Sequence, residues 1–234
     1  MKKAVYAVGR FQPPTIGHAA MIDVITSLAH SQGAEALVFV SSTQGTGKEK
    51  LKNPLTSAEK VPFLQKMFPS GVRFVDTAQC DPRCGGPLAA YSYLLERGYN
   101  DITLVAGSDR ESEFGPSGQI WKSLEDVPPP KFYAVSRDAD DESASSDPTQ
   151  MSGTKARNLV VAGDFAGFTK AVKRGNVTDA DVKVLYDLLR QRLAKKGGRK
   201  TRRLTRLTRN KASSRVLYRR GLRSRNGSSK TSRS

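Results

Sequence analysis

Residues 9–18, GRFQPPTIGH, combine a histidine, an arginine and two glycines where a strand gives way to a helix. The apolar run at 4–8 before them is typical of a buried strand, and the apolar residues after them fall at helical spacing. Free backbone N–H groups at a helix start favour bound anions. Gly9 lets the backbone approach a ligand closely, and Gly17 leaves room beside the helix start. The stretch therefore predicts a site for a phosphate-like anion, with His18 in the first helical turn.

A second group of anion-binding residue types lies late in the chain, in the sequence MSGTKAR at 151–157. Ser152 has the residue type of a helix N-cap. Ser152 and Thr154 offer hydroxyl groups together with the N–H groups of the helix start, where the helix dipole favours negative charge. Arg157 follows about one turn later, and its planar guanidinium can bind a phosphate with two parallel hydrogen bonds.

Strand-like and helix-like segments alternate along the chain and must position these two groups. We expect strands at 4–8, 36–40, 72–75, 102–106 and 131–135, and helices at 19–30, 57–67, 87–97, 164–174, 179–195 and from 152 onward. This alternation predicts a Rossmann-like α/β fold, with a parallel sheet, flanking helices and further C-terminal helices. The polar segment 41–53 is expected to be a mobile loop at a strand's carboxyl end, where open α/β sheets bind ligands.

Both groups resemble the signatures of the nucleotidyltransferase superfamily that has a His-x-Gly-His motif, which includes nicotinamide-mononucleotide, phosphopantetheine and cytidylyl transferases. Thr15 replaces the first histidine, as in the phosphopantetheine enzymes, and His18 matches the second. The opening GRFQP is more similar to the nicotinamide-mononucleotide enzymes, and PPT before GH also resembles proteins of large phages and viruses. Residues 152–157 match the later Ser-x-Thr-x-x-Arg signature.

The resemblance implies transfer of a nucleoside monophosphate from a nucleoside triphosphate to a phosphorylated acceptor, such as nicotinamide mononucleotide, with release of pyrophosphate. ATP is favoured as the donor, and CTP is the alternative. Phosphoryl-type transfer needs positioning and charge stabilisation more than a covalent nucleophile. Mg²⁺ would be held mainly by the nucleotide phosphates, since the sequence contains no carboxylate cluster dedicated to a metal.

The same resemblance assigns roles to individual residues. His18 would bind an oxygen of the reacting α-phosphate, Thr15 would lie towards the attacking phosphate, and Arg157 would hold the triphosphate; these three are the catalytic candidates. Lys52, Lys48 or Lys50 would close over the phosphates. The full set of expected nucleotide- and phosphate-binding residues is Gly9, Arg10, Phe11, Gly17, His18, Lys52, Ser152, Thr154 and Arg157.

Two further residues resemble an acceptor-binding segment of the nicotinamide-mononucleotide enzymes. There a Gly-x-Asp follows a strand, and a downstream tryptophan stacks on the acceptor base. Asp109 and Trp121 match those positions here, although the spacing is loose. Alternatively, Asp109 caps a turn and Trp121 is a core residue.

The positive charge is concentrated at one end of the chain. Of the 39 Lys and Arg residues, 16 lie in residues 195–234, which contain no Asp or Glu, leaving 23 basic residues against 22 acidic ones elsewhere. We therefore expect a near-neutral domain at 1–195 and a basic tail at 196–234. The tail has no apolar periodicity and is expected to be disordered. Such a charge block is typical of an arm that binds nucleic acid or another polyanion.

The cysteines and the hydropathy bear on the compartment. Cys80 and Cys84 are expected to be free thiols rather than a disulfide framework or a zinc site, which needs about four ligands. No apolar run approaches the roughly 20 residues of a membrane span, and no secretory signal is visible. We expect a cytoplasmic protein, or a nuclear one if the basic run at 195–203 acts as a nuclear address.

A hypothesis from another class of function also fits the sequence. The protein could be a nucleic-acid-binding or virion-type protein whose nucleotidyltransferase-like domain is catalytically idle. The presence of His18, Ser152, Thr154 and Arg157 argues against an inactive site. The sequence does not determine the oligomeric state.

Overall fold

The computed structural model describes residues 1–43, 49–81, 83–124, 127–135 and 151–194, with residues 49 and 50 described in their backbone alone. The described fold is formed by residues 1–193, and residues 194–234 form a separate unit. The predicted basic tail therefore lies outside the described residues, and the boundary expected at 195 stays a prediction.

The centre of the fold is a five-stranded sheet in which all neighbouring strands are parallel. The strands are β1 (Lys2–Gly9), β2 (Glu35–Val40), β3 (Arg73–Asp76), β4 (Tyr99–Gly107) and β5 (Lys131–Val135). Their order across the sheet is β3-β2-β1-β4-β5. This confirms the predicted Rossmann-like α/β class, and every predicted strand is present within a few residues of its expected bounds.

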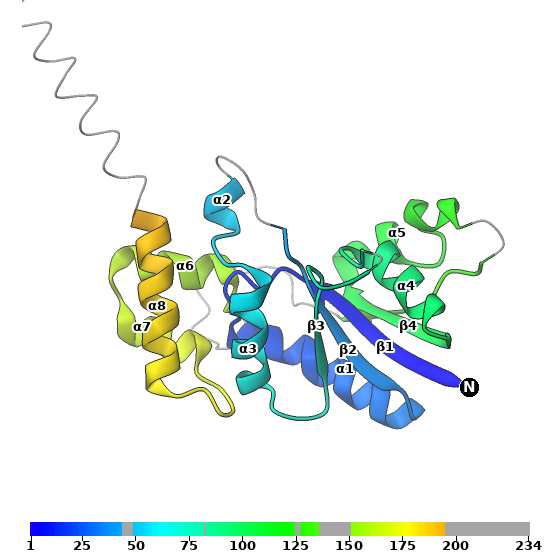
Figure 1. The fold of residues 1–234 in the computed structure, drawn as a ribbon, viewed down its shortest axis with the longest axis horizontal. Helices are drawn as coiled ribbons and strands as arrows, with labels where there is room; N and C mark the ends of the chain where they lie inside the picture. Colours follow the sequence, from blue (N-terminus) through cyan, green and yellow to red (C-terminus); the bar gives the residue numbers. More distant parts are fainter. Residues whose placement is uncertain (44–48, 82, 125–126, 136–150, 195–234) are drawn as a thin grey trace, which may run out of the picture. The chain divides into compact units, whose positions relative to one another are not determined.

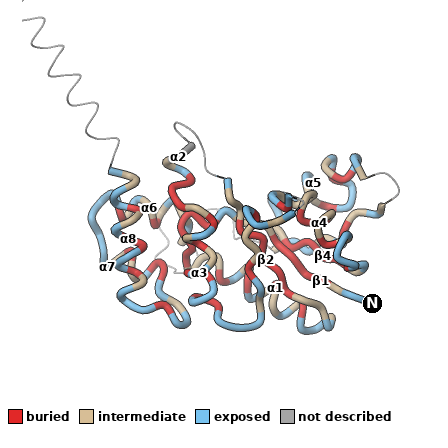
Figure 2. The backbone as a smooth tube through the Cα atoms, in the orientation of Figure 1, coloured by how far each residue is buried: buried red, intermediate tan, exposed pale blue. Residues whose placement is uncertain are grey.

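Strand β1 is central, and its sequence is apolar because both of its faces are covered. Val5 and Ala7 belong to one hydrophobic core, whereas Ala4 and Tyr6 belong to another on the opposite face. All four residues are at most 1% exposed, and Figure 2 shows the resulting band of buried residues along the sheet.

Helices cover both faces of the sheet. They are α1 (Ala19–Gln32), α2 (Glu49–Lys52), α3 (Ser57–Met67), α4 (Pro87–Glu96), α5 (Glu111–Phe114), α6 (Gly153–Ala162), α7 (Phe165–Val172) and α8 (Asp179–Ala194). Residues of α1, α3, α6, α7 and α8 share one core, and α4 contributes to the other. In Figure 1, β1 runs from the labelled N-terminus towards the group formed by α6, α7 and α8.

Local sequence signals explain where several helices begin and end. Thr56 and Glu59 form a capping box at the start of α3, which is the helix expected at 57–67. Gly33 ends α1 in the left-handed conformation, with φ of 60°. The segment 41–53 differs from its prediction as a continuous loop, because the short helix α2 forms within it. Short helical turns also follow β4, at Ser108–Arg110 and Gln119–Ser123.

The two cysteines correct a prediction. Cys80 and Cys84 form a disulfide, with their Cα atoms 5.7 Å apart, in the loop between β3 and α4. The expectation of free thiols is therefore wrong, since this loop brings the two residues within ordinary bonding distance. The cysteines consequently give no support to a reducing compartment.

The order of the strands reverses its direction beside β1. The chain proceeds outward from β1 through β2 to β3, and it then continues on the other side of β1 with β4 and β5. In an open α/β sheet, ligands bind outside the carboxyl ends of the strands at such a reversal. Gly9 ends β1 and Gly107 ends β4, so the early motif and Asp109 follow the two strands that flank the reversal.

Candidate nucleotide site

The loop after β1 folds back over the strand end. Phe11 has φ of 47°, which is rare for a residue other than glycine, and its side chain is 1% exposed. A Cβ atom added at Gly9 would collide with the Phe11 ring. The ring also packs on His18, with ring centroids 4.8 Å apart. Gly9 therefore permits a backbone turn that packs the Phe11 ring against the His18 ring.

His18 is oriented by Thr15. The backbone N–H of Thr15 donates to His18 Nδ1 at 3.0 Å, whereas Nδ1 lies 3.3 Å from the Thr15 carbonyl oxygen. Because a backbone N–H can only donate, we assign Nδ1 as the acceptor and place the proton of the neutral ring on Nε2. His18, like its neighbour Gly17, lies in the short 3-10 turn Ile16–His18 that leads into α1. His18 therefore presents a second nitrogen suited to donate a hydrogen bond.

Thr15 joins the early motif to the late one. Its side chain is fully buried, and its hydroxyl donates to the Met151 carbonyl oxygen at 2.6 Å while lying 2.9 Å from His18 Nδ1. We predicted from the sequence that Thr15 would lie towards the attacking phosphate. That role stays a prediction; the described contacts show that its hydroxyl proton is directed to Met151, the residue before Ser152.

The late motif packs directly on the loop after β1. Ser152 caps α6, and its hydroxyl accepts from Lys155 N at 3.2 Å. A Cβ atom at Gly153 would lie 2.6 Å from the Gln12 carbonyl oxygen, so glycine allows this close approach. The Arg157 guanidinium donates to that same Gln12 oxygen and, at 3.1 Å, to Thr154 Oγ1. Two motifs separated by more than 130 residues thus form one structure, as the sequence predicts.

Positive charge gathers where the motifs meet. Burial lowers the pKa of Arg157, and the neighbouring Arg10 guanidinium lowers it further. Arg10 itself is exposed. Two cations held near each other are stabilised by a bound anion, since an opposite charge offsets both the repulsion and the loss of water. The start of α6 adds backbone N–H groups beside them. The site is therefore suited to a polyphosphate.

Two residues of the site were not predicted as site residues from the sequence. Gln12 is 6% exposed; its amide donates to the Leu55 carbonyl oxygen at 2.8 Å and accepts from Leu55 N at 2.9 Å. Lys60 is 1% exposed and bonds to the Arg10 and Ser41 carbonyl oxygens at 2.8 and 2.5 Å. A sequence signal existed for Lys60, which falls at helical spacing with the apolar residues of α3.

Burial of Lys60 predicts that stability depends on pH. Desolvation lowers its pKa from about 10.5 to about 8, partly opposed by the Asp76 and Glu59 carboxylates. Below pH 8 the lysine is protonated in both the folded and the unfolded chain. Between pH 8 and about 10.5 the unfolded chain binds more protons, so stability increases with pH. We expect the free energy of unfolding of the wild type, relative to Lys60→Met, to rise by on the order of 2–3 kcal/mol over this range.

Urea unfolding of both proteins at several pH values measures this difference. Subtracting the variant removes the contribution of Tyr6, Tyr91 and Tyr99, whose pKa values are raised mainly by burial. The free energy of unfolding of the wild type relative to Lys60→Met could instead stay constant from pH 8 to pH 10.5. That result would mean that Lys60 titrates in the folded protein as it does in the unfolded chain.

The loop lysines and Asp109 are the next predicted site residues to be located. Lys52 lies at the end of α2 and is exposed; Lys48 and the side chain of Lys50 lie outside the described residues. Asp109 follows the end of β4, and its carboxylate, which lies over Gly107, approaches Arg110 at 3.4 Å. Asp109 is thus on the same edge of the sheet as the motifs.

Trp121 lies in the core. It is 5% exposed, packs edge-on against Tyr91, and donates its indole N–H to the Phe114 and Gly115 carbonyl oxygens at 3.1 and 2.9 Å. These contacts favour the core role that the sequence left open over a stacking platform for an acceptor base.

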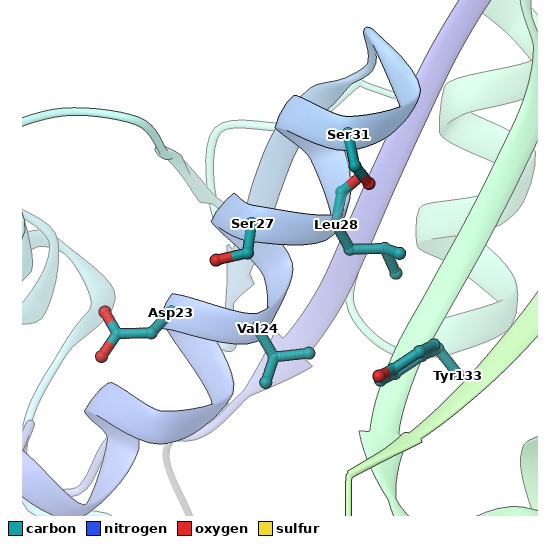
Figure 3. A pocket seen from close by; sticks show the side chains of 6 residues that line it. All are labelled: Asp23, Val24, Ser27, Leu28, Ser31 and Tyr133. Atoms are coloured by element: carbon teal, nitrogen blue, oxygen red, sulfur yellow. The ribbon is translucent and has the colours of Figure 1, made fainter.

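A hollow elsewhere on the surface does not coincide with the motifs. It has a volume of about 400 Å³ and lies between α1 and β5, where Figure 3 shows Val24 and Leu28 turned towards Tyr133. None of the predicted site residues lines it. We base the site on the contacts between the two motifs, since they carry the charge and the hydrogen-bond donors.

The described residues contain no cluster of three or more His, Cys, Asp or Glu side chains that could hold a metal ion. In the same part of the chain, no helix has both the length and the apolar character needed to cross a membrane.

The α6 helix start packs on the loop after the central parallel strand, which also carries Arg10 and the oriented His18, and this arrangement is consistent with a nucleotidyltransferase. The sequence comparison agrees: residues 6–158, which include both motifs, match the cytidylyltransferase-like family model. The chain belongs to that family. No curated protein matches the chain as a relative.

Solved structures with a similar fold are distant in sequence. The nicotinic acid mononucleotide adenylyltransferase of Plasmodium falciparum, solved with NaAD, is 14% identical with a TM-score of 0.50; the match covers 81% of this chain and 98% of that one. A Vibrio parahaemolyticus protein described as a nicotinate-nucleotide adenylyltransferase is 19% identical with a TM-score of 0.49, over 79% of this chain and 99% of its own. At these identities, the Plasmodium match supports the fold alone.

Proposed function

We propose that the protein transfers a nucleoside monophosphate from a nucleoside triphosphate to a small phosphorylated acceptor and releases pyrophosphate. The observation that carries this proposal is the packing of Arg157 and the α6 helix start on the loop that also holds His18. ATP is the favoured donor and CTP the alternative. A mononucleotide of the nicotinamide or nicotinic acid type is the favoured acceptor, because such substrates fit the GRFQP resemblance and the name of the Plasmodium fold relative.

In the proposed reaction, an oxygen of the acceptor phosphate attacks the α-phosphorus of the nucleotide. A new P–O bond forms while the bond to the β-phosphate oxygen breaks, and pyrophosphate leaves. No protein nucleophile takes part. Catalysis rests on positioning and on stabilising the charge that develops on the phosphate oxygens.

Different residues of the site bind different parts of the nucleotide in this proposal. His18 donates from Nε2 to an oxygen of the α-phosphate, and Thr15 with Phe11 holds the imidazole in place. Arg157, Arg10 and the N–H groups at the start of α6 bind the leaving pyrophosphate portion, together with the hydroxyls of Ser152 and Thr154. Lys52 is a further candidate for a phosphate contact, and Asp109 for an acceptor contact.

Mg²⁺ fits this site only as an ion carried largely by the nucleotide. The described residues provide no carboxylate cage, and Mg²⁺ commonly binds substrate phosphates with few protein ligands. When bound, the ion would neutralise part of the phosphate charge.

A substrate panel tests the proposal. The full-length protein is incubated with ATP, CTP, GTP or UTP and Mg²⁺, together with nicotinamide mononucleotide, nicotinic acid mononucleotide, phosphopantetheine or phosphocholine. Pyrophosphate release and the condensed product are measured. We expect both with ATP and a mononucleotide. Absence of pyrophosphate with every pair, in a protein shown to be folded, would contradict the proposed reaction.

Arg157 gives a specific prediction for nucleotide affinity. Its guanidinium is half-buried beside Arg10, so its charge serves an anion. Replacing Arg157 with alanine should weaken nucleotide binding by about 1.5–3 kcal/mol, the range for a hydrogen bond to a charged group. Arg157→Lys should restore only part of the affinity because lysine lacks the planar fork. Calorimetric titration with ATP measures both variants, and Arg174→Ala, which removes an exposed ion pair with Asp23, is the control.

A second proposal concerns the basic residues 195–234. Their 16 Lys and Arg residues, with no Asp or Glu, favour binding to a nucleic acid or another polyanion. This binding would accompany nucleotidyl transfer or, if the domain were catalytically idle, would be the protein's main activity. The same charge fits a nuclear address, and a cytoplasmic location is the alternative.

A further inference from the structure

Lys60 carries a buried charge that the proposed reaction does not use. The side chain is 1% exposed in α3, and burying an ammonium group costs free energy unless hydrogen bonds compensate. Its two described acceptors are backbone carbonyl oxygens, those of Arg10 and Ser41, at 2.8 and 2.5 Å. The nearest carboxylates that influence it are Asp76 and Glu59. Lys60 is therefore bound to the main chain rather than to an acidic partner.

The two acceptors follow the carboxyl ends of neighbouring strands. The β1–β2 ladder extends to the bond from Ser41 N to the Gly9 carbonyl oxygen, at 2.9 Å. Past that point the two segments of the chain separate. The segment after β1 forms the anion-binding loop, and the segment after β2 leads to α2. Lys60 bridges the segments after β1 and β2 at the point where the backbone hydrogen bonding between them ends.

The geometry assigns Lys60 as a positioning residue that holds the loop after β1, and with it Arg10, at a fixed distance from the segment after β2. Gln12 fixes the same loop at a second point through Leu55. The Gln12 carbonyl oxygen of this loop accepts from Arg157. Residues of α3 and of α6 thus both hold the loop, and the nucleotide meets a rigid backbone. This role rests on the proposed nucleotidyl transfer.

The experiment compares Lys60→Met with Lys66→Met. Methionine is close in length to lysine but cannot donate a hydrogen bond. Lys66 lies on the same helix, and its side chain is 49% exposed and paired with Asp181 at the surface, so its replacement is a matched control. Hydrogen–deuterium exchange of full-length protein is followed in peptides spanning 9–18 and 37–43. Steady-state rates with ATP and the acceptor from the substrate panel are measured in parallel.

We expect Lys60→Met to raise exchange at least about fivefold in both peptides and to raise the KM for ATP about tenfold, as for a lost charged hydrogen bond. The KM for the acceptor should stay within about twofold, since only the phosphate-binding loop is displaced. A general loss of stability would lower the folded fraction without this difference between the two KM values. Lys66→Met should match the wild type in every measurement.

Unchanged exchange in both peptides of folded Lys60→Met would overturn the proposal, as would an unchanged KM for ATP. If Lys60→Met does not fold, Lys60→Gln, which keeps a donor but loses the charge, replaces it under the same criteria. If the wild type releases no pyrophosphate with any substrate pair, the proposed function fails, but the exchange measurement still decides whether Lys60 holds the two segments together.

Discussion

Replacing His18 with alanine is expected to lower the turnover number by about 10²–10³ while the fold survives. The ring is held by the Thr15 N–H and by the Phe11 ring, and the assigned proton on Nε2 makes that nitrogen a preorganised donor. A donor fixed before the reaction stabilises developing charge without reorganising, and losing one typically costs this much in rate. Initial rates of pyrophosphate release at saturating ATP and acceptor measure the effect.

The second histidine of the chain supplies the control. His30 is exposed in the last turn of α1, and His30→Ala should keep the wild-type rate. Thermal unfolding should give nearly equal midpoints for the two variants, because His18 is only half-buried. Turnover of His18→Ala at the wild-type level would refute its contact with the α-phosphate, even if nucleotide still binds.

The sequence predicts the fold of this protein well because its signals are local. Each strand is an apolar run, and the capping box at Thr56 and the glycine at 33 determine where α3 begins and α1 ends. The short helix α2 was missed because four residues rich in lysine and glutamate carry no apolar periodicity. The disulfide was missed because pairing depends on the shape of the loop rather than on the cysteine count.

The two motifs of the candidate site were recognised in the sequence, whereas the residues that support them were not. The resemblance placed His18 and Arg157 at one anion site, and their shared loop agrees with that arrangement. Lys60 was missed because a lysine in an amphipathic helix is ordinarily a surface residue. The resemblance places Thr15 towards the attacking phosphate, which stays a prediction, but it does not give the direction of the Thr15 hydroxyl, which depends on Met151, 136 residues away.

Deleting residues 197–234 is expected to abolish binding to DNA and RNA and to leave nucleotidyl transfer nearly intact. The deleted part contains nearly all of the 16 basic residues of the tail, whereas both motifs lie before residue 158. Affinity of the full-length protein should fall steeply with salt, with a log–log slope of about −0.9 for each phosphate neutralised on duplex DNA. Fluorescence anisotropy from about 50 to 200 mM salt, with DNA and RNA of several sequences, measures this dependence.

A charge variant separates electrostatic binding from recognition of sequence. Replacing Arg199, Lys200, Arg202 and Arg203 with glutamine should reduce the magnitude of the slope by about 0.9 for each phosphate that the variant no longer neutralises. Affinity should change little between nucleic-acid sequences, because the sequence of the tail predicts no helix that could read base edges. Absence of binding by the full-length protein at low salt would eliminate the polyanion partner. If the truncated protein folds but no longer releases pyrophosphate, then residues 197–234 belong to the enzyme, and their charge serves the reaction rather than a separate partner.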